Sequence, residues 1–417
     1  MSRIVLTTIG SFGDLHPKIA LALELRKRGH NVVLATHKEY QDKIEALGFE
    51  FHRMRPDNHA LNDPQEMARM MDLKTGTEYV IKDWVVANLR ETYTDLMDIA
   101  KDADFIVAGE GVVAARLVAE KLEIPWAFAV LQPASFLSIY DPSVLPMFPF
   151  SKQRRLGSLF NRGIIQLSKV ISKSWAEPIH QLRQELDLPP LIGNPFIDDK
   201  YSPYLVLAMF SSAFAKPQPD WAANTVTTGF IFYDGSEEYT QITPNVKQFL
   251  DAGEPPIVFT LGSSAVMAPG RFYQESIQAA KLLNRRAVLL MGKNVPPENL
   301  SDDIIAVSYV PYSQIFPRAC GIVHQGGIGT TAQALRAYRP TLVMPYSHDQ
   351  PDNAARIERL GTSLTIPRKQ YSAGRVAKQL SELLENPNYT AKALEIGRII
   401  QSENGVGVAC DAIEKQL

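Results

Sequence analysis

The chain has 417 residues, of which 45% are hydrophobic, and a formal net charge of −2. That length and composition suit a globular protein of two or three domains. The near-neutral charge argues against a nucleic-acid-binding protein, because such proteins carry a basic excess.

The two cysteines, Cys320 and Cys410, lie far apart in the sequence, so we expect no disulfide framework and a reducing compartment. The first ten residues, MSRIVLTTIG, have too short an apolar core for a signal peptide. No apolar run approaches the ~20 residues that cross a bilayer. We therefore expect a cytoplasmic protein, with peripheral attachment at the inner face of the membrane as an alternative.

The first hundred and thirty residues predict alternating strands and helices. Residues 3–9 read as a buried strand, because they are short, β-branched and bounded by glycine. Pro17 is expected to open a helix that ends at Gly29, and residues 31–35 form the next strand. The pattern recurs as a strand at 105–109, a helix around 112–122 and a strand at 125–130. Such units build parallel sheets.

Regularity fails between residues 131 and 200, where Pro, Phe and Tyr are frequent and a helix is expected within 154–175. A strand returns at 204–210, and the proline-containing segment 215–244 resembles a domain boundary. The strand rhythm then restarts, and a helical tail spans 389–416. The expected later strands are 256–264, 286–292, 304–310, 321–327 and 341–346.

These elements predict an α/β fold with two doubly wound domains that face each other across a cleft. We place the first domain at 1–225 and the second at 226–395, with a C-terminal helix, 396–417, that packs back on the first domain. Ligands bind outside the carboxyl ends of strands in open parallel sheets. Two such domains would share one cleft between their strand ends.

A glycine-rich turn stands between an expected strand and an expected helix. Residues 327–332, GIGTTA, match G-x-G-x-x-A, and the acid Asp349 lies about twenty residues on, as in a dinucleotide fingerprint. Glycines let the backbone approach a ligand closely, and the free N–H groups of a helix start point at an anion. The motif therefore predicts a phosphate site but does not name the ligand.

Three details weigh against a nicotinamide dinucleotide. The turn lies in the second half of the chain, and His324 ends the strand just before it. Asp349 lies in a loop beyond the next strand, not at the strand's end. Its neighbour Gln350 adds donors and acceptors that suit several sugar hydroxyls.

The segment 310–361, which contains VHQGGIGTTAQAL and SHDQPDNAARIERLG, resembles the donor-binding signature of nucleotide-sugar glycosyltransferases with two Rossmann-like domains, the GT-B superfamily. The N-terminal GSFGDLHPKIALALELRKRGH is similar to the opening of the same superfamily. The resemblance is strongest to the bacterial and fungal branch, which holds sterol glucosyltransferases, antibiotic glycosyltransferases and rhamnosyltransferases.

The resemblance implies which residues hold a UDP- or dTDP-sugar. The glycine turn at 326–330 and the Gly262–Ser263 turn would bind the diphosphate. Tyr309 and Val310 would contact the nucleobase, and Asp349 and Gln350 would bind the sugar. Relatives often carry a phosphate-contacting histidine where this chain has Gln325, which leaves His324 and Gln325 as alternatives. The implied donor residues are Gly13, Gly262, Ser263, Tyr309, Val310, His324, Gln325, Gly326, Gly327, Gly329, Thr330, Asp349 and Gln350, with Thr331 a weaker candidate.

The resemblance also places a catalytic base in the loop after the first strand, three residues before Pro17. That residue is Asp14, and the alternative is that it only caps the helix. A carboxylate with a pKa of about 3.9 is a weak base, so proton transfer would have to come late in the reaction. His16 is the competing base, because its ordinary pKa suits the task better. Glu110 could face the same cleft, but no partner for a relay is evident.

The irregular middle of the chain is expected to build an acceptor pocket. Its expected lining is Phe136, Tyr140, Met147, Phe148, Phe150 and Trp175. The span 152–173 places apolar residues at helical spacing among basic ones. We expect this helix to pack into the core with a solvated cationic face; contact with an anionic membrane is the alternative.

The sequence thus predicts an inverting glycosyltransferase that moves a hexose from a UDP- or dTDP-sugar to a hydroxyl of a hydrophobic small molecule or lipid. Inversion is implied by the resemblance alone. The alternatives are an NAD(P)-dependent oxidoreductase that uses the 327–332 turn, and a nucleotide-sugar-binding protein without turnover. No cofactor, metal or nucleic acid is expected, and the protein should be a monomer or a weak dimer.

Overall fold

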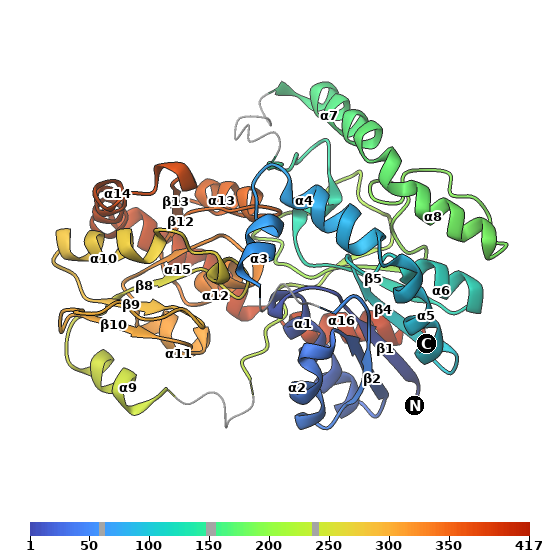
Figure 1. Ribbon diagram of the computed structural model, residues 1–417, viewed down its shortest axis with the longest axis horizontal. Helices are drawn as coiled ribbons and strands as arrows, with labels where there is room; N and C mark the ends of the chain where they lie inside the picture. Colours follow the sequence, from blue (N-terminus) through green and yellow to red (C-terminus); the bar gives the residue numbers. More distant parts are fainter. Residues whose placement is uncertain (58–62, 147–155, 236–241) are drawn as a thin grey trace.

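The computed structural model describes residues 1–57, 63–146, 156–235 and 242–417. In these residues the strands form two wholly parallel sheets, one in each half of the chain, with helices on their faces (Figure 1). The predicted fold class, two doubly wound α/β domains, is confirmed.

The first sheet has the strand order β3-β2-β1-β4-β5-β6-β7. Its strands are β1 (Arg3–Thr7), β2 (Asn31–Thr36), β3 (Glu50–Arg53), β4 (Phe105–Gly109), β5 (Trp126–Val130), β6 (Leu205–Ala208) and β7 (Thr225–Thr227). The helices that accompany it are α1 (Phe12–Lys27), α2 (Gln41–Ala46), α3 (Pro64–Met70), α4 (Gly76–Glu78), the π-helical η3 (Tyr79–Val86), α5 (Leu89–Ala100), α6 (Ala114–Leu122), α7 (Ser158–Ile171) and α8 (Lys173–Glu185).

The second sheet has the order β10-β9-β8-β11-β12-β13. Its strands are β8 (Ile257–Thr260), β9 (Ala287–Leu290), β10 (Ile304–Val307), β11 (Gly321–His324), β12 (Thr341–Val343) and β13 (Ser363–Thr365). The remaining helices are α9 (Pro244–Asp251), α10 (Phe272–Leu282), α11 (Tyr312–Ile315), α12 (Ile328–Arg336), α13 (Gln350–Arg359), α14 (Ala373–Glu385), α15 (Pro387–Ser402) and α16 (Gly405–Glu414).

Each sheet reverses its strand order at one point. In the first sheet the chain winds outward from β1 to β3 and then returns to place β4 on the other side of β1. In the second sheet it winds from β8 to β10 and returns to place β11 beside β8. Loops on either side of such a switch point diverge and leave a crevice at the strand ends. The loops after β1, β4, β8 and β11 are therefore the ones positioned to hold ligands.

The last helix of the chain lies on the first domain. α16 packs on α1, and Cys410 and Ile413 enter the apolar cluster around β1. Arg28 at the end of α1 pairs with Asp411 and Glu414, at 2.6 Å each. Figure 1 shows α16 beside α1 and the C-terminus near the N-terminus. Both cysteines are free.

The start of α1 differs from the prediction that Pro17 opens the helix. The helix begins at Phe12, with Ser11 as its N-cap and Pro17 inside it. The Gly13 N–H donates to Ser11 Oγ at 3.2 Å, and the Ser11 N–H donates to the Asp14 carboxylate at 2.8 Å. This capping box fixes the start one turn earlier than proline alone would.

The two domains are joined by elements that cross between them. α3 packs its methionines, Met67 and Met70, into the apolar core of the second domain. Beyond it, Ser347 Oγ donates to the Asp72 carbonyl at 2.8 Å, and Thr77 Oγ1 lies 3.2 Å from His348 Nδ1. Residues 64–77 therefore contact the second domain although they lie in the first half of the chain.

The expectation that the helix within 152–173 packs into the core is wrong for its described part. Within α7, whose residues are all described, only Asn161 is buried. Leu159 is 82% exposed and Val170 is 71% exposed. Lys152, Arg154 and Arg155 lie outside the described residues. None of the helices in the described part of the chain has both the length and the apolar character that a membrane crossing needs.

Candidate active site

A single cavity of about 1330 Å³ lies between the two domains, at the carboxyl ends of both sheets. Residues from the loops after β1, β4, β8 and β11 all line it. Sites for one small ligand usually measure about 300–1,000 Å³. The cavity is therefore large enough for two substrates side by side.

Most of the site residues expected from the sequence meet in this cavity. The residues that line it are Gly13, Asp14, His16, Gly262, Ser263, Tyr309, Val310, Gln325, Gly327, Gly329, Thr330, Asp349 and Gln350. His324 and Gly326 do not belong to the lining in the described part of the chain, nor does Thr331.

The loop after β1 holds the Asp14 carboxylate in one orientation. Asp14 Oδ2 accepts the Ser11 N–H at 2.8 Å and lies 3.3 Å from Ser11 Oγ. Gly10 has φ +144°, and a Cβ at that position would lie 2.3 Å from Asp14 Oδ2. Only glycine leaves room for the carboxylate here. Asp14 therefore takes part in the cap of α1, which was the alternative to a catalytic role, and it also lines the cavity.

The Asp14 carboxylate takes up a proton more readily in the folded protein than an exposed aspartate does in water. Burial raises the pKa of Asp14, and the Ser11 N–H and the Lys18 ammonium oppose that rise. Lys18 lies one turn further along α1 and is 1% exposed; burial lowers its pKa to about 7. Its spacing of four residues from Asp14 was a helical signal that the sequence interpretation did not use.

His16 lines the same cavity among aromatic rings. Its ring centroid lies 5.2 Å from those of Phe12 and Tyr233. Burial, with a contribution from the Lys43 charge, lowers the pKa of His16 to about 3. The imidazole is therefore neutral at physiological pH and a poor acceptor of protons.

Glu110, at the end of β4, has the partners that the sequence did not reveal. Gln132 Nε2 donates to Glu110 Oε1 at 3.1 Å, and the Ser135 hydroxyl donates to Oε2. Lys200 Nζ donates to the Ser135 carbonyl at 2.5 Å. Burial raises the pKa of Glu110, and the nearby Lys200 charge opposes that rise.

The glycine turn after β11 presents the start of α12 to the cavity. Gly327 is the N-cap residue, and the first helical residues follow it directly. Free N–H groups at a helix start attract anions. Gln325 lies in the cavity wall, whereas His324 is fully buried behind it and accepts the Gly326 N–H on Nδ1 at 3.0 Å. His324 and Gly326 therefore support the turn from behind and lie outside the lining, and their contact with the donor stays a prediction.

The two glycine turns of the second domain meet at Gln325. Gly262, after β8, has φ +67°, and a Cβ there would lie 2.2 Å from Gln325 Nε2. Gln325 Nε2 also lies 3.5 Å from Thr330 Oγ1. Tyr309 is 67% exposed on the same wall, and its neighbour Val310 is buried.

Asp349 and Gln350 lie at the start of α13, on the side of the cavity formed by the second domain. Asn353 Nδ2 donates to Asp349 Oδ2 at 2.5 Å, and the Tyr346 N–H donates to Gln350 Oε1 at 2.9 Å. Burial, together with the charges of Asp14 and Glu110, raises the pKa of Asp349 to about 7. The carboxylates of Asp14 and Glu110 from the first domain and of Asp349 from the second therefore line the same cavity.

The apolar part of the lining comes partly from the middle region 131–200 and partly from residues 67–85 and 126–128, which the sequence did not single out. It is formed by Met67, Met70, Met71, Val80, Ile81, Trp84, Val85, Trp126, Phe128, Leu137, Ile179, Leu191 and Phe196. The expected acceptor residues Phe136, Tyr140 and Trp175 are not part of the lining. Phe136 instead stacks on Trp221, with ring centroids 4.0 Å apart. Met147, Phe148 and Phe150 lie outside the described residues.

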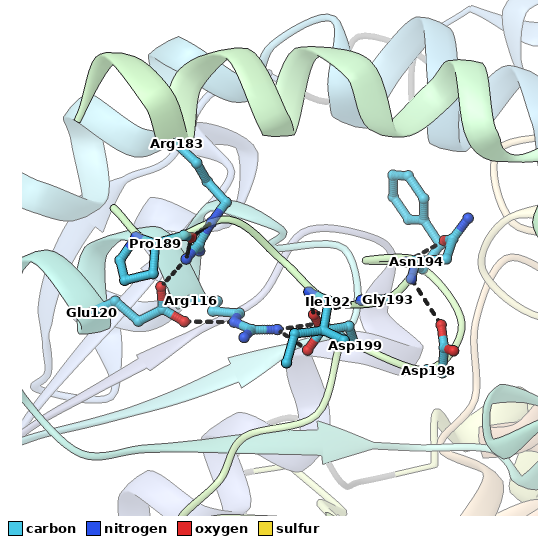
Figure 2. A network of polar contacts seen from close by, with 10 residues as sticks. Arg116, Glu120, Arg183, Pro189, Ile192, Gly193, Asn194, Asp198 and Asp199 are labelled. Atoms are coloured by element: carbon cyan, nitrogen blue, oxygen red, sulfur yellow. Dashed lines mark hydrogen bonds and ion pairs between the residues drawn. The ribbon is translucent and has the colours of Figure 1, made fainter. Parts of the chain in front are cut away.

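A network of ion pairs braces the apolar end of the cavity (Figure 2). Arg116 of α6 pairs with Glu120 at 2.6 Å and with Asp199 at 2.7 Å, and Glu120 pairs in turn with Arg183 of α8 at 2.6 Å. The loop between α8 and Asp199 is tied down by hydrogen bonds from the backbone of Ile192 and Gly193 to that aspartate. The loop carries Leu191 and Phe196, so the network fixes that apolar wall.

Two family models match the chain. The glycosyltransferase family 28 N-terminal domain matches residues 4–140, and the erythromycin biosynthesis protein CIII-like C-terminal domain matches residues 287–404. The first match contains the loops of Asp14 and Glu110, and the second contains the glycine turn and the start of α13.

Curated relatives align over nearly the whole chain. A sterol 3-beta-glucosyltransferase of Yarrowia lipolytica is 27% identical over 99% of this chain, which spans 28% of that relative's length. An O-mycaminosyltylonolide 6-deoxyallosyltransferase of Streptomyces fradiae is 28% identical over 99% of this chain and 97% of its own. The chain thus spans little more than a quarter of the sterol glucosyltransferase but almost all of the deoxyallosyltransferase.

Solved structures share the two-domain fold. The glycotransferase of kitacinnamycin superposes with a TM-score of 0.75 at 19% identity, covering 100% of this chain and 99% of its own. A spinosyn rhamnosyltransferase in complex with thymidine diphosphate superposes with a TM-score of 0.67 at 18% identity, covering 99% of this chain and 100% of its own. The family models, the relatives and the two-domain fold agree with the resemblance read from the sequence: this is a UDP-glycosyltransferase-like protein with a GT-B fold.

Proposed function

We propose that the protein is an inverting glycosyltransferase that moves a hexose from a UDP- or dTDP-sugar to a hydroxyl of a hydrophobic small molecule or lipid. One observation carries the proposal: Asp14 of the first domain lines the same cavity as the Gln325–Thr330 turn and the Asp349–Gln350 pair of the second. The names of two relatives, a sterol 3-beta-glucosyltransferase and an O-mycaminosyltylonolide 6-deoxyallosyltransferase, support this assignment.

The second domain suits a nucleotide sugar. The start of α12 and the Gly262–Ser263 turn would hold the diphosphate through backbone N–H groups. The exposed ring of Tyr309 offers a surface on which a nucleobase can stack. Asp349 and Gln350 would bind the sugar hydroxyls as acceptor and donor.

The apolar end suits a hydrophobic acceptor. Its methionine and aromatic side chains offer an adaptable apolar surface, and the braced loop with Phe196 gives it a fixed wall. In transfer, the acceptor oxygen would attack the anomeric carbon, its proton would pass to the Asp14 carboxylate, and the bond from the anomeric carbon to the diphosphate oxygen would break. The helix start would stabilise the departing negative charge.

Replacing Gln325 with Ala is expected to raise the KM for the donor by on the order of tenfold or more, because a hydrogen bond to a charged group contributes about 1.5–3 kcal/mol. The matched variant is His324→Ala, which lies one residue away but outside the lining. It should lower the melting temperature and change the donor KM less. Steady-state kinetics with varied donor measure both variants. A larger KM change in His324→Ala would reverse the roles given to these two residues.

Asp349→Asn is expected to stabilise the free protein at pH 8 while it weakens sugar transfer. The pKa of Asp349, about 7 in the folded chain, exceeds its ordinary value of 3.8, so the folded state loses stability as pH rises from about 4 to 7. The variant removes that loss, on the order of 1–2 kcal/mol because cavity water screens the carboxylate. Calorimetry without ligands should show a higher melting temperature than wild type at pH 8 and equal values at pH 4. Equal melting temperatures at pH 8 would contradict the shifted pKa.

The proposed reaction is tested by a donor screen. UDP, dTDP and NAD are added separately in thermal-shift measurements, and UDP- and dTDP-hexoses are then incubated with mixed sterol, macrolide and phenolic acceptors and analysed by mass spectrometry. We expect stabilisation by UDP or dTDP and an acceptor whose mass increases by one hexose residue. Stabilisation by NAD alone would favour the oxidoreductase alternative. Nucleotide binding without any transfer would favour the binding protein without turnover.

We propose no resident cofactor or metal, because amides and hydroxyls suffice to hold a diphosphate; turnover should persist in a chelator. We further propose a cytoplasmic monomer or weak dimer that contacts the inner face of the membrane peripherally.

A further inference from the structure

α7 presents apolar side chains to solvent. Five of the large apolar residues that are exposed in the described part of the chain fall within residues 156–170: Leu156, Leu159, Phe160, Leu167 and Val170. Leaving such side chains in water forfeits the stabilisation that burial would give. A cluster of this kind usually marks a surface with a partner.

The exposed side chains share one face of the helix. With about 100° per residue, Leu159 and Val170 project in nearly the same direction, and Phe160 and Leu167 project beside them. Arg162 borders this face, and Lys173 is exposed where α7 meets α8. The span 156–176 contains three basic residues and no acid. Of these, Lys169 is paired, at 2.6 Å, with Asp198.

The opposite side of α7 is attached to the rest of the molecule. Asn161 Nδ2 donates to the Ile139 carbonyl at 2.9 Å, and Asn194 Nδ2 donates to Ser172 Oγ at 2.9 Å. The second contact comes from the loop that the ion-pair network braces. Figure 1 shows α7 at the edge of the molecule, away from both sheets. The apolar face is thus held outward by the fold.

We propose that this α7 face, defined as Leu159, Phe160, Leu167 and Val170 with Arg162 and Lys173, docks on an anionic lipid bilayer. An interfacial helix buries its apolar side chains at the headgroup boundary while its basic residues meet anionic lipids. The absence of acids over 156–176 matches a negatively charged surface and disfavours a positively charged partner.

The role of the α7 face in the entry of an acceptor rests on the proposed function. α8 follows α7 directly and contributes Ile179 and Arg183 to the cavity lining. Leu145 and Pro146 line the cavity shortly before α7 begins. Docking through α7 therefore brings the apolar end of the cavity near the lipid phase, from which a hydrophobic acceptor would enter.

The test is co-sedimentation of the full chain with vesicles, without donor or acceptor. One set is phosphatidylcholine alone, and the other is phosphatidylcholine mixed equally with phosphatidylglycerol. Wild type should bind the anionic set and lose binding in high salt. Leu159→Glu with Val170→Glu should lower the partition coefficient by about tenfold or more. Arg162→Glu with Lys173→Glu should lower it by on the order of fivefold for each residue on the anionic set.

The matched control is Leu282→Glu with Val295→Glu, which alters side chains of similar exposure, 65% and 87%, in the second domain. It should bind like wild type. The proposal is overturned if wild type binds neither vesicle set, or if the control loses binding equally. It is also overturned if light scattering shows a dimer that only the α7 variant dissociates, because the face then joins two copies. Transfer to a water-soluble acceptor should persist in the α7 variant, so failure of docking and failure of the proposed reaction are separable.

Discussion

Asp14→Asn should lower kcat by on the order of 10³-fold, because a positioned general base contributes about 10²–10⁴-fold. The amide oxygen of asparagine can still accept the Ser11 N–H, so the start of α1 should stay in place. In the proposed reaction the second domain binds the donor, so the donor should bind the variant with unchanged affinity. Initial rates at saturating donor and acceptor, with a UDP or dTDP titration of the same sample, measure both quantities.

The pH profile gives a second readout of Asp14. Burial raises its pKa above the ordinary 3.8, so the protonated, inactive form persists to higher pH than for an exposed aspartate. The rate of wild type should fall as pH decreases through this pKa, and the remaining rate of the variant should lack that limb. Ser11→Ala is the control: it loses the cap hydroxyl, costs about 1 kcal/mol of stability, and should retain most of the activity. A variant with kcat within a few-fold of wild type would remove Asp14 from the mechanism.

Arg356→Met should destabilise the protein by about 3–5 kcal/mol, because it leaves the buried Asp352 carboxylate without its cation and removes the closest ion pair of Asp141. Arg356 is 1% exposed and pairs with Asp352 of its own helix at 2.6 Å and with Asp141 of the first domain at 2.5 Å. Asp352 also accepts the Val144 N–H at 2.9 Å. The group thus ties α13, which begins beside Asp349, to the first domain. Urea unfolding should show the loss, and the donor KM should rise with it.

Arg359→Met is the matched control, because Arg359 lies one turn away, reaches the same Asp141 at 3.7 Å, and has a side chain that is 36% exposed. Ion pairs of that exposure contribute at most about 1 kcal/mol. Replacing Arg356, Asp352 and Asp141 together with Met, Asn and Asn should recover part of the lost stability. Equal losses in the two single variants would show that burial of the Arg356 pairs does not set their strength.

The strands and the glycine turn could be predicted from the sequence because each has a local cause. Buried parallel strands are short apolar runs bounded by glycine, and the expected strand at 105–109 coincides with β4. The start of α1 was missed although its cause is also local: the Ser11–Asp14 capping box was outweighed by the proline signal. The exposure of α7 was missed because helical spacing of apolar residues indicates a face, not what covers it.

The sequence by itself determined the two doubly wound domains, the loop of Asp14, the glycine turn and the Asp349–Gln350 pair, since each rests on residue types within a few positions of one another. Only the tertiary structure decided that Gln325 lines the cavity while His324 lies behind it. It alone brought Met67 and Trp84 to the apolar end, gave Glu110 its partners, and turned the α7 face outward. These outcomes depend on how segments far apart in the chain pack across the cleft, and that packing leaves no periodic signal in any one of them.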